Sequence, residues 1–194
     1  PTPRLNPATM RLVAREAPRP TGPNGVIMGY RLGAPPADAP VTMPSPVLFL
    51  TRGVPTDVTV VNRLDEPTGV HWHGLEIPVE MDGMPGISQD AIPPGGRFTY
   101  EFTLKQNGTF FYHSHMPMQE MMGMIGFFIV HPAKPHAPRV DRDFGLILQG
   151  WAILPNNTIP NTLAMEFNWL TFNGKSGPAT TPIVVKRGER VRIR

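Results

Sequence analysis

The stretch FTYEFTLKQNGTFFYHSH, residues Phe98–His115, combines the signals that decide the fold. Apolar and polar residues alternate over Phe98–Leu104, which predicts a half-buried β-strand. Asn107-Gly108 is typical of tight hairpin turns, so we expect the chain to return as a second strand. Side chains two positions apart share one face of a strand, which places His113 and His115 together. The stretch therefore predicts a β-hairpin that presents paired histidines.

The rest of the chain also favours an all-β protein. Its 194 residues include 25 prolines and 19 glycines but only 17% charged residues, a composition that suits many turns between short strands. Hydrophobic residues make up 40% of the chain, enough for a core. Short apolar or alternating runs predict further strands at Val47–Leu50, Val58–Val61 and Ile125–Val130, with a turn at Arg52–Pro55.

Changes in composition divide the chain into four expected segments. They are an extended N-terminal arm over 1–40 with one strand near Val26–Leu32, a first β-sandwich domain over 41–131, a proline-rich linker over 132–143, and an incomplete second domain over 144–194.

The second domain is predicted from an internal repeat. An apolar strand, an Arg-Gly turn and an alternating strand occur over 47–60, and the same order returns over 183–194. A complete β-sandwich domain of this type needs roughly 100 residues, about twice the length of chain beyond the linker. We therefore expect the sequence to be part of a longer chain.

Charge and composition exclude several classes of function. The formal net charge of +3 is spread along the chain without a basic stripe, so we expect no nucleic-acid binding. No apolar run is long enough to predict a membrane span. The chain has no cysteine, which excludes disulfides, thiolate nucleophiles and thiolate-bound metals within these residues.

Two histidine pairs predict a metal site. His71 and His73 flank Trp72, and His113 and His115 form the second pair. Within each pair the imidazoles project from one face of a strand, while Trp72 points to the other face and is expected in the core. Four neutral imidazoles suit copper or zinc, whereas calcium and magnesium prefer oxygen ligands. The residues by themselves leave both copper and zinc open.

HWHG at 71–74, Met81-Asp82-Gly83 and GTFFYHSH at 108–115 together resemble the first domain of the multicopper oxidases. The stretch Val58–Val130 is most similar to the bacterial copper-oxidase and copper-resistance branch, and the resemblance covers most of the chain beyond residue 45. It implies a cupredoxin-like Greek-key β-sandwich, followed by the first strands of a second cupredoxin domain.

The resemblance also implies a role for each site residue. In this family the first histidine of HWHG binds the type 2 copper of a trinuclear cluster, which assigns that ion to His71. His73 and His113 would bind one type 3 copper, and His115 the other. Asp82 stands where related oxidases carry an acid near the cluster, which implies a catalytic role in proton delivery. The alternative for Asp82 is an ordinary Asp-Gly turn residue.

The resemblance further implies that this chain holds only part of an oxidase. The type 1 copper needs a cysteine thiolate, so that ion and the remaining cluster ligands belong to other cupredoxin domains, in the same or a partner chain. A laccase-like enzyme of this kind oxidises phenols or metal ions such as Cu(I), reduces dioxygen to water, and is periplasmic or secreted. We expect the isolated chain to be inactive, and its sequence does not define the reducing substrate.

Two further alternatives stay open. A non-catalytic copper storage or delivery module could use the same histidines. Methionines near the histidine pairs could bind Cu(I) through soft thioethers, or they could fill an irregular surface, which is the interpretation we favour. They are Met81, Met84, Met116, Met118, Met121, Met122 and Met124.

Overall fold

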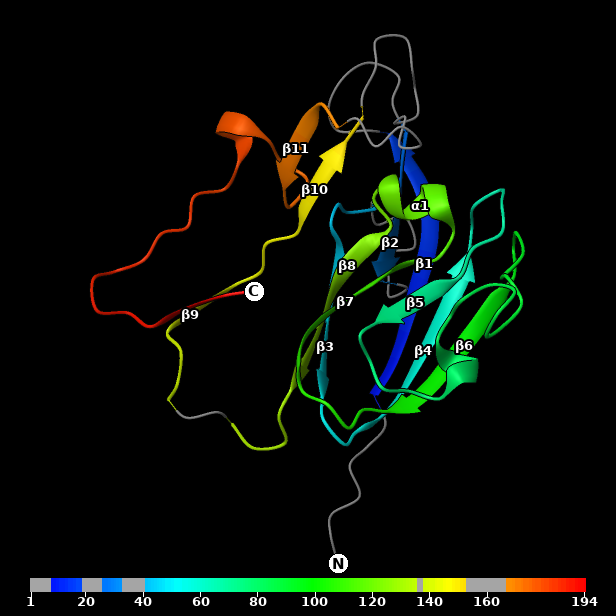
Figure 1. Cartoon of the computed structure of the whole chain (residues 1–194), viewed down its shortest axis with the longest axis horizontal. Coiled ribbons are helices and arrows are strands. Elements are labelled where there is room, and N and C mark those ends of the chain that lie inside the picture. Colours follow the sequence, from blue (N-terminus) through cyan, green and yellow to red (C-terminus); the bar gives the residue numbers. More distant parts are fainter. Residues whose placement is uncertain (1–7, 19–25, 33–40, 136–137, 153–166) are drawn as a thin grey trace, which may run out of the picture.

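The computed structural model describes residues 8–18, 26–32, 41–135, 138–152 and 167–194. Within these ranges most regular elements are strands (Figure 1). Two four-stranded sheets form the larger part of the described structure, one in the order β2-β1-β4-β6 and the other in the order β3-β8-β7-β5. The predicted all-β sandwich is confirmed.

The first sheet contains a strand that the sequence did not reveal. Its strands are β1 (Ala8–Pro18), β2 (Val26–Leu32), β4 (Pro55–Asn62) and β6 (Arg97–Thr103). The strand expected at Val26–Leu32 is confirmed, but the description of 1–40 as an extended arm is wrong for β1. This strand lies inside the sheet, antiparallel to β2 and parallel to β4. Its central residues 12–14 are all buried, so no alternation marks it in the sequence.

The second sheet carries both histidine pairs. Its strands are β3 (Ser45–Thr51), β5 (Val70–His73), β7 (Gly108–Ser114) and β8 (Ile125–His131). Strand β7 pairs antiparallel with both β5 and β8, and β3 is parallel to β8. The expected strands at Val47–Leu50 and Ile125–Val130 are confirmed within β3 and β8.

The hairpin expected across Asn107-Gly108 is wrong. Strand β6 pairs with β4 in the first sheet, whereas β7 lies in the second, so residues 104–107 carry the chain from one sheet to the other. The two strands lie in different sheets because each buries an aromatic side chain against Trp72 in the core between the sheets. Tyr100 of β6 contacts Trp72 across the core, and Tyr112 of β7 lies beside Trp72 in the second sheet.

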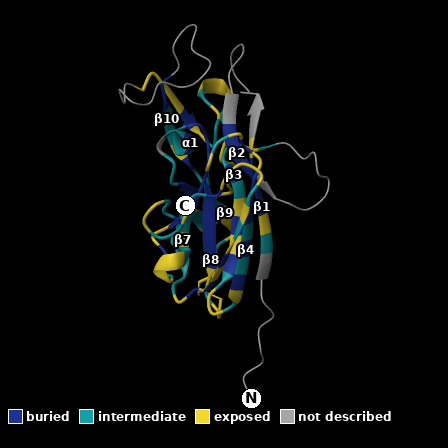
Figure 2. Cartoon of the chain, turned by 90° about the vertical axis from the view of Figure 1, so that its right-hand side faces the viewer, coloured by how far each residue is buried: buried dark blue, intermediate teal, exposed yellow. Residues whose placement is uncertain are grey.

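Trp72 forms the centre of the core, as predicted for the core-facing residue of HWHG. Its side chain is fully buried, and its ring contacts the rings of Tyr100, Phe102, Tyr112 and Phe128 at centroid distances of 5.1–5.9 Å. Figure 2 shows β8 as largely buried, because Phe128 and Val130 belong to this core while Phe127 and Ile129 pack in a second cluster with Ile147. Because Trp72 fills the inner face of β5, the histidines on either side of it must lie on the outer face.

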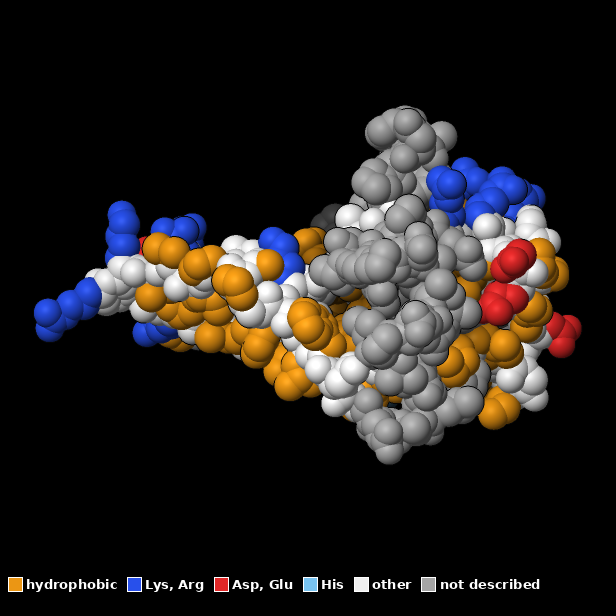
Figure 3. All heavy atoms as spheres, turned by 90° about the horizontal axis from the view of Figure 1, so that it is seen from above, with side chains coloured by type: hydrophobic (Ala, Val, Ile, Leu, Met, Phe, Trp, Pro, Cys, Tyr) orange, Lys and Arg blue, Asp and Glu red, His pale blue; other side chains and the backbone are white. Residues whose placement is uncertain are grey.

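The C-terminal part forms two small sheets beside the sandwich. Strands β10 (Leu148–Trp151) and β11 (Trp169–Phe172) pair antiparallel, while β12 (Val191–Ile193) pairs parallel with β9 (Arg142–Phe144). Figure 3 shows hydrophobic side chains along the part that projects from the sandwich. The exposed ones in this part of the described chain are Leu148, Phe167, Trp169, Leu170, Phe172, Ile183, Val184, Val185 and Ile193.

The structure shows only part of the predicted repeat between residues 47–60 and 183–194. Gly53 and Gly188 both occupy turns with positive φ, 82° and 92°, as expected for the two Arg-Gly turns. The strand expected over residues 183–186 does not form, so only β12 comes after the second turn among the described residues. The boundaries of the linker and of the second domain therefore stay predictions.

Helical structure is short in the described chain. It consists of α1 (Pro117–Met121) and the 3₁₀ turns η1 (Val79–Met81) and η2 (Gly177–Ala179). None of these could cross a membrane. Both η1 and α1 adjoin the histidine pairs and position side chains against them.

Candidate metal centre

Strands β5 and β7 bring the two histidine pairs together. Their register places His71 opposite His113 and Trp72 opposite Tyr112. Trp72 and Tyr112 are fully buried on the core side, so the imidazoles lie on the opposite face of the sheet. Two motifs far apart in the sequence thus become one cluster on adjacent strands.

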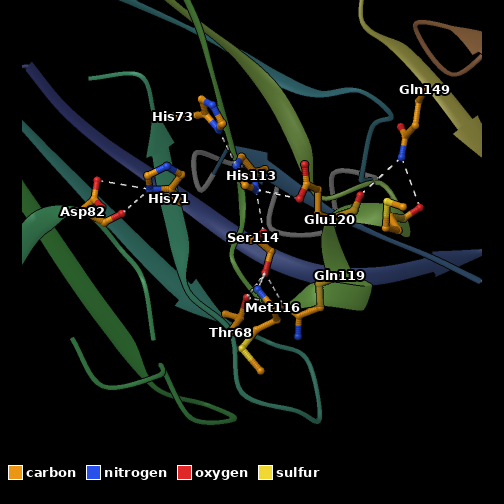
Figure 4. A network of polar contacts seen from close by, with 11 residues as sticks. Thr68, His71, His73, Asp82, His113, Ser114, Met116, Gln119, Glu120 and Gln149 are labelled. Carbon is orange, nitrogen blue, oxygen red and sulfur yellow. Dashed lines mark hydrogen bonds and ion pairs between the residues drawn. The ribbon is translucent and has the colours of Figure 1, made fainter. Parts of the chain in front are cut away.

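The imidazoles of His71, His73 and His113 lie close together (Figure 4). One ligand nitrogen from each of His71, His73 and His113 lies within 4.8 Å of the others. Nδ1 of His73 is 3.2 Å from Nε2 of His113. His115 lies just beyond the end of β7, with its ring centroid 5.4 Å from that of His71 and 6.1 Å from that of His113. All four predicted histidines therefore belong to one cluster, with His115 at its edge.

His71 is oriented by Asp82. Nδ1 of His71 lies 2.8 Å from the backbone oxygen of Asp82 and 3.3 Å from its carboxylate Oδ1. Two oxygen acceptors require the proton on Nδ1, which leaves the lone pair on Nε2 available to a metal ion. The close approach depends on Gly83, which has a φ of 78° and whose Cβ, if present, would collide with the backbone oxygen of Val70.

His113 is held in the same way by residues that come after it in the chain. Nδ1 of His113 lies 2.9 Å from the backbone oxygen of Ser114 and 3.2 Å from Oε2 of Glu120. Burial lowers the pKa of His113, but Glu120 and the Ser114 carbonyl outweigh it, so the net pKa is raised. Glu120 is not among the site residues expected from the sequence. The available signal was its position shortly after the second histidine pair, where a helical turn brings the chain back over β7.

The charges around the cluster are mutually dependent. Burial and the neighbouring rings of His113 and His71 lower the pKa of His73, which favours the neutral imidazole that binds metals. Burial raises the pKa of Glu120, but the hydrogen bond with His113 and the nearby imidazoles outweigh it and lower the net pKa. Glu120 therefore provides a negative charge next to a cluster of metal-ligand type.

Helix α1 is anchored by a buried hydrogen-bond network around Gln119. The Gln119 side chain is 1% exposed, and its Oε1 accepts hydrogen bonds from Thr68 Oγ1 at 2.6 Å and Ser114 Oγ at 2.7 Å. Its Nε2 donates to Glu66 Oε1 at 2.7 Å and to the backbone oxygen of Pro67 at 2.8 Å. The helix is thereby fixed both to β7 and to the segment that leads into β5.

The methionines near the site do not form a uniform surface. Met122 and Met124 are 3% and 0% exposed and belong to the main hydrophobic core. The half-buried side chains are Met81, Met84, Met116, Met118 and Met121. Packing thus accounts for part of the methionine-rich segment.

The donor set fits copper. It offers four imidazoles, no thiolate and no cysteine, and at least three ligand nitrogens are close enough to share ions. Residues 41–135, which include all four histidines of the cluster, match the sequence profile of the family described as multicopper oxidase. The chain belongs to the multicopper oxidase family.

Individual multicopper oxidases and copper proteins match over much of the chain. Copper resistance protein A of Escherichia coli is 37% identical over 131 residues, which cover 68% of this chain and 22% of the relative. The multicopper oxidase mgLAC superposes with a TM-score of 0.80 at 27% identity, covering 97% of this chain and 60% of mgLAC. The blue copper oxidase of Nitrosomonas europaea gives a TM-score of 0.75 at 28% identity, covering 97% of this chain and 59% of that protein.

These matches confirm the cupredoxin-like fold and the family expected from HWHG and HSH. The chain spans 22% of the length of the Escherichia coli copper resistance protein that it matches. Family membership implies copper as the metal and identifies the chain as part of an oxidoreductase family.

Proposed function

We propose that this chain supplies half of the histidine ligands of a trinuclear copper cluster in a dioxygen-reducing multicopper oxidase. The observation that carries the proposal is the convergence of His71, His73 and His113, with ligand nitrogens within 4.8 Å of one another. The 3.2 Å approach of His73 to His113 supports a shared type 3 copper. His71, with its separate anchor on Asp82, would bind the type 2 copper, and His115 the second type 3 copper.

The bound copper ions would supply the electrons that reduce dioxygen to water. The residues of this chain would hold the ions, orient the imidazoles and deliver protons. Asp82 is suited to proton delivery because its side chain is 26% exposed and also contacts His71. Its carboxylate would thus accept protons from solvent water and pass them to the cluster.

The remaining parts of the oxidase would come from further cupredoxin domains, in the same or a partner chain. They would provide the type 1 copper, with its cysteine, and the other cluster histidines. The reducing substrate would be a phenol or a metal ion such as Cu(I), and the isolated chain would be inactive. We also propose a periplasmic or secreted location, on the basis of the family resemblance. A storage module is not favoured, because solved structures that this chain resembles, mgLAC and the Nitrosomonas europaea protein among them, are described as oxidases.

Copper titration tests the metal site directly. The combined substitution His71→Ala and His113→Ala should abolish tight copper binding by the folded protein. His131→Ala is the matched control, since His131 stacks on Phe49 and lies outside the cluster. Undiminished copper content in the double variant would refute the assignment. Dioxygen uptake with a phenol or Cu(I) as reductant then tests the oxidase, and it should require domains that carry a type 1 copper.

A further inference from the structure

His71 and His113, which lie opposite each other on β5 and β7, are held by matching pairs of oxygen atoms. Each Nδ1 faces one backbone carbonyl and one carboxylate: Asp82 provides both for His71, whereas Ser114 and Glu120 share the task for His113. Asp82 corresponds to an acid already expected near the cluster. Glu120 is its structural counterpart on the other strand.

We propose that Glu120 is a positioning residue for His113 as a copper ligand. This inference rests on the proposed copper centre. With a proton held on Nδ1 by Glu120 and Ser114, the lone pair of His113 is on Nε2, the atom that lies 3.2 Å from Nδ1 of His73. A carboxylate on the far side of an imidazole fixes the ring and makes it a stronger donor to a metal ion.

The place of Glu120 is fixed by its own helix. The neighbouring Gln119 anchors α1 in the buried network, and the backbone oxygen of Glu120 accepts a hydrogen bond from Gly123 N–H at 3.0 Å. From the C-terminal part, Gln149 Nε2 donates to the backbone oxygen of Met121 at 3.3 Å (Figure 4). A single short helix would fray in water, but contacts on both sides keep this one in position.

The competing interpretation is an ordinary ion pair that stabilises the fold. Exposed pairs of this kind contribute little to the free energy of unfolding. The Glu120 side chain is 37% exposed, but its partner His113 is only 8% exposed and uses its other nitrogen within the cluster. A stabilising pair would affect unfolding of the copper-free protein, whereas a positioning residue would affect copper binding and the copper spectrum.

The test compares Glu120→Gln, which removes the charge but keeps the size, with Glu120→Asp, which keeps the charge. Glu101→Gln is the matched control, because Glu101 is exposed on β6, in the other sheet. We expect Glu120→Gln to weaken Cu(II) affinity, measured by chelator competition, about 10- to 100-fold and to change the Cu(II) paramagnetic resonance spectrum. Glu120→Asp should recover part of both, and Glu101→Gln should match the wild type.

Identical affinity and spectra for Glu120→Gln and Glu101→Gln would overturn the proposal. A wild-type protein without histidine-bound copper would overturn the copper centre itself, and the inference with it. If Glu120→Gln does not fold, nitrogen NMR of the copper-free wild type decides the matter. His113 protonated on Nδ1 supports the proposal, and His113 protonated on Nε2 overturns it.

Discussion

Nδ1 of His73 lies 3.2 Å from Nε2 of His113, so the two rings approach each other through different nitrogens. The pair is diagonal across β5 and β7, because the register places His73 opposite Phe111. Phe111 stacks on the His73 ring with centroids 4.2 Å apart and an interplanar angle of 21°. This stacking and the oxygen atoms around Nδ1 of His113 give each ring a defined orientation before any metal binds.

A double-mutant cycle on this pair should show strong coupling. If His73 and His113 share one ion, either His73→Ala or His113→Ala removes most of the affinity for it, and the combined variant loses little more. Chelator competition on the three variants measures the coupling. Additive losses would mean that the two histidines bind separate ions.

Replacing Asp82 by Asn should separate copper binding from turnover. The backbone oxygen of Asp82, 2.8 Å from Nδ1 of His71, remains, so at saturating Cu(II) the copper content should not change, even though the affinity weakens as it does for Glu120→Gln. Loss of the proton donor should slow dioxygen reduction by the assembled oxidase about 10²- to 10⁴-fold. Asp90→Asn is the control because Asp90 is exposed on the surface. Equal rates for both variants would show that Asp82 is a turn residue only.

Gln119→Leu should destabilise the fold. The substitution leaves the hydroxyls of Thr68 and Ser114 without their shared acceptor in a buried site. Each unsatisfied group costs about 1–3 kcal/mol, so we expect the free energy of unfolding to fall by about 2–6 kcal/mol. Urea denaturation of the copper-free protein measures this loss. Gln106→Leu, which removes only solvent-exposed hydrogen bonds, should cost clearly less.

Stability should decline at alkaline pH, and Tyr100 should contribute. Burial raises the pKa of Tyr100 to about 12 in the folded protein, whereas the unfolded side chain ionises near pH 10. This contribution is complete below about pH 10 and is lost as the pH rises towards 12, by at most about 1.4 kcal/mol per pH unit. Burial also raises the pKa values of Tyr30 and Tyr112 well above normal, so the three tyrosines act in the same direction.

Tyr100→Phe should therefore flatten the dependence of unfolding free energy on pH between about 10 and 12. At neutral pH it should cost about 1 kcal/mol, because the Tyr100 hydroxyl accepts a hydrogen bond from the Val70 N–H at 3.1 Å. Denaturation series at several pH values provide the measurement. An unchanged alkaline slope would contradict the assigned ionisation.

Met122→Leu and Met124→Leu together should leave Cu(I) affinity unchanged. Both side chains are buried in the core, and leucine has a similar volume, so we expect a stability cost below about 1.5 kcal/mol per substitution. Cu(I) competition with a chromogenic chelator checks the affinity. A marked loss of Cu(I) affinity would revive the interpretation of this segment as a cuprous-ion site.

The sequence predicted those features that depend on local periodicity. The alternation in Phe98–Leu104 correctly predicted β6, and the spacing of HWHG correctly predicted a buried Trp72. It missed β1, because residues 12–14 are buried on both faces and show no alternation. It also assigned Asn107-Gly108 to a hairpin, because a turn signal does not specify whether the next strand joins the same sheet.

By itself, the sequence determined the β class, the family and which four histidines form the cluster. Side-chain chemistry and the two-residue alternation of β-strands are properties of the local chain. Only the tertiary structure decided which nitrogens face one another and which oxygens hold them. Glu120 reaches His113 because Gln119 anchors α1 over β7, and Asp82 reaches His71 because Gly83 allows the loop to touch β5. Such contacts depend on packing between segments that are distant in sequence, and no local pattern encodes them.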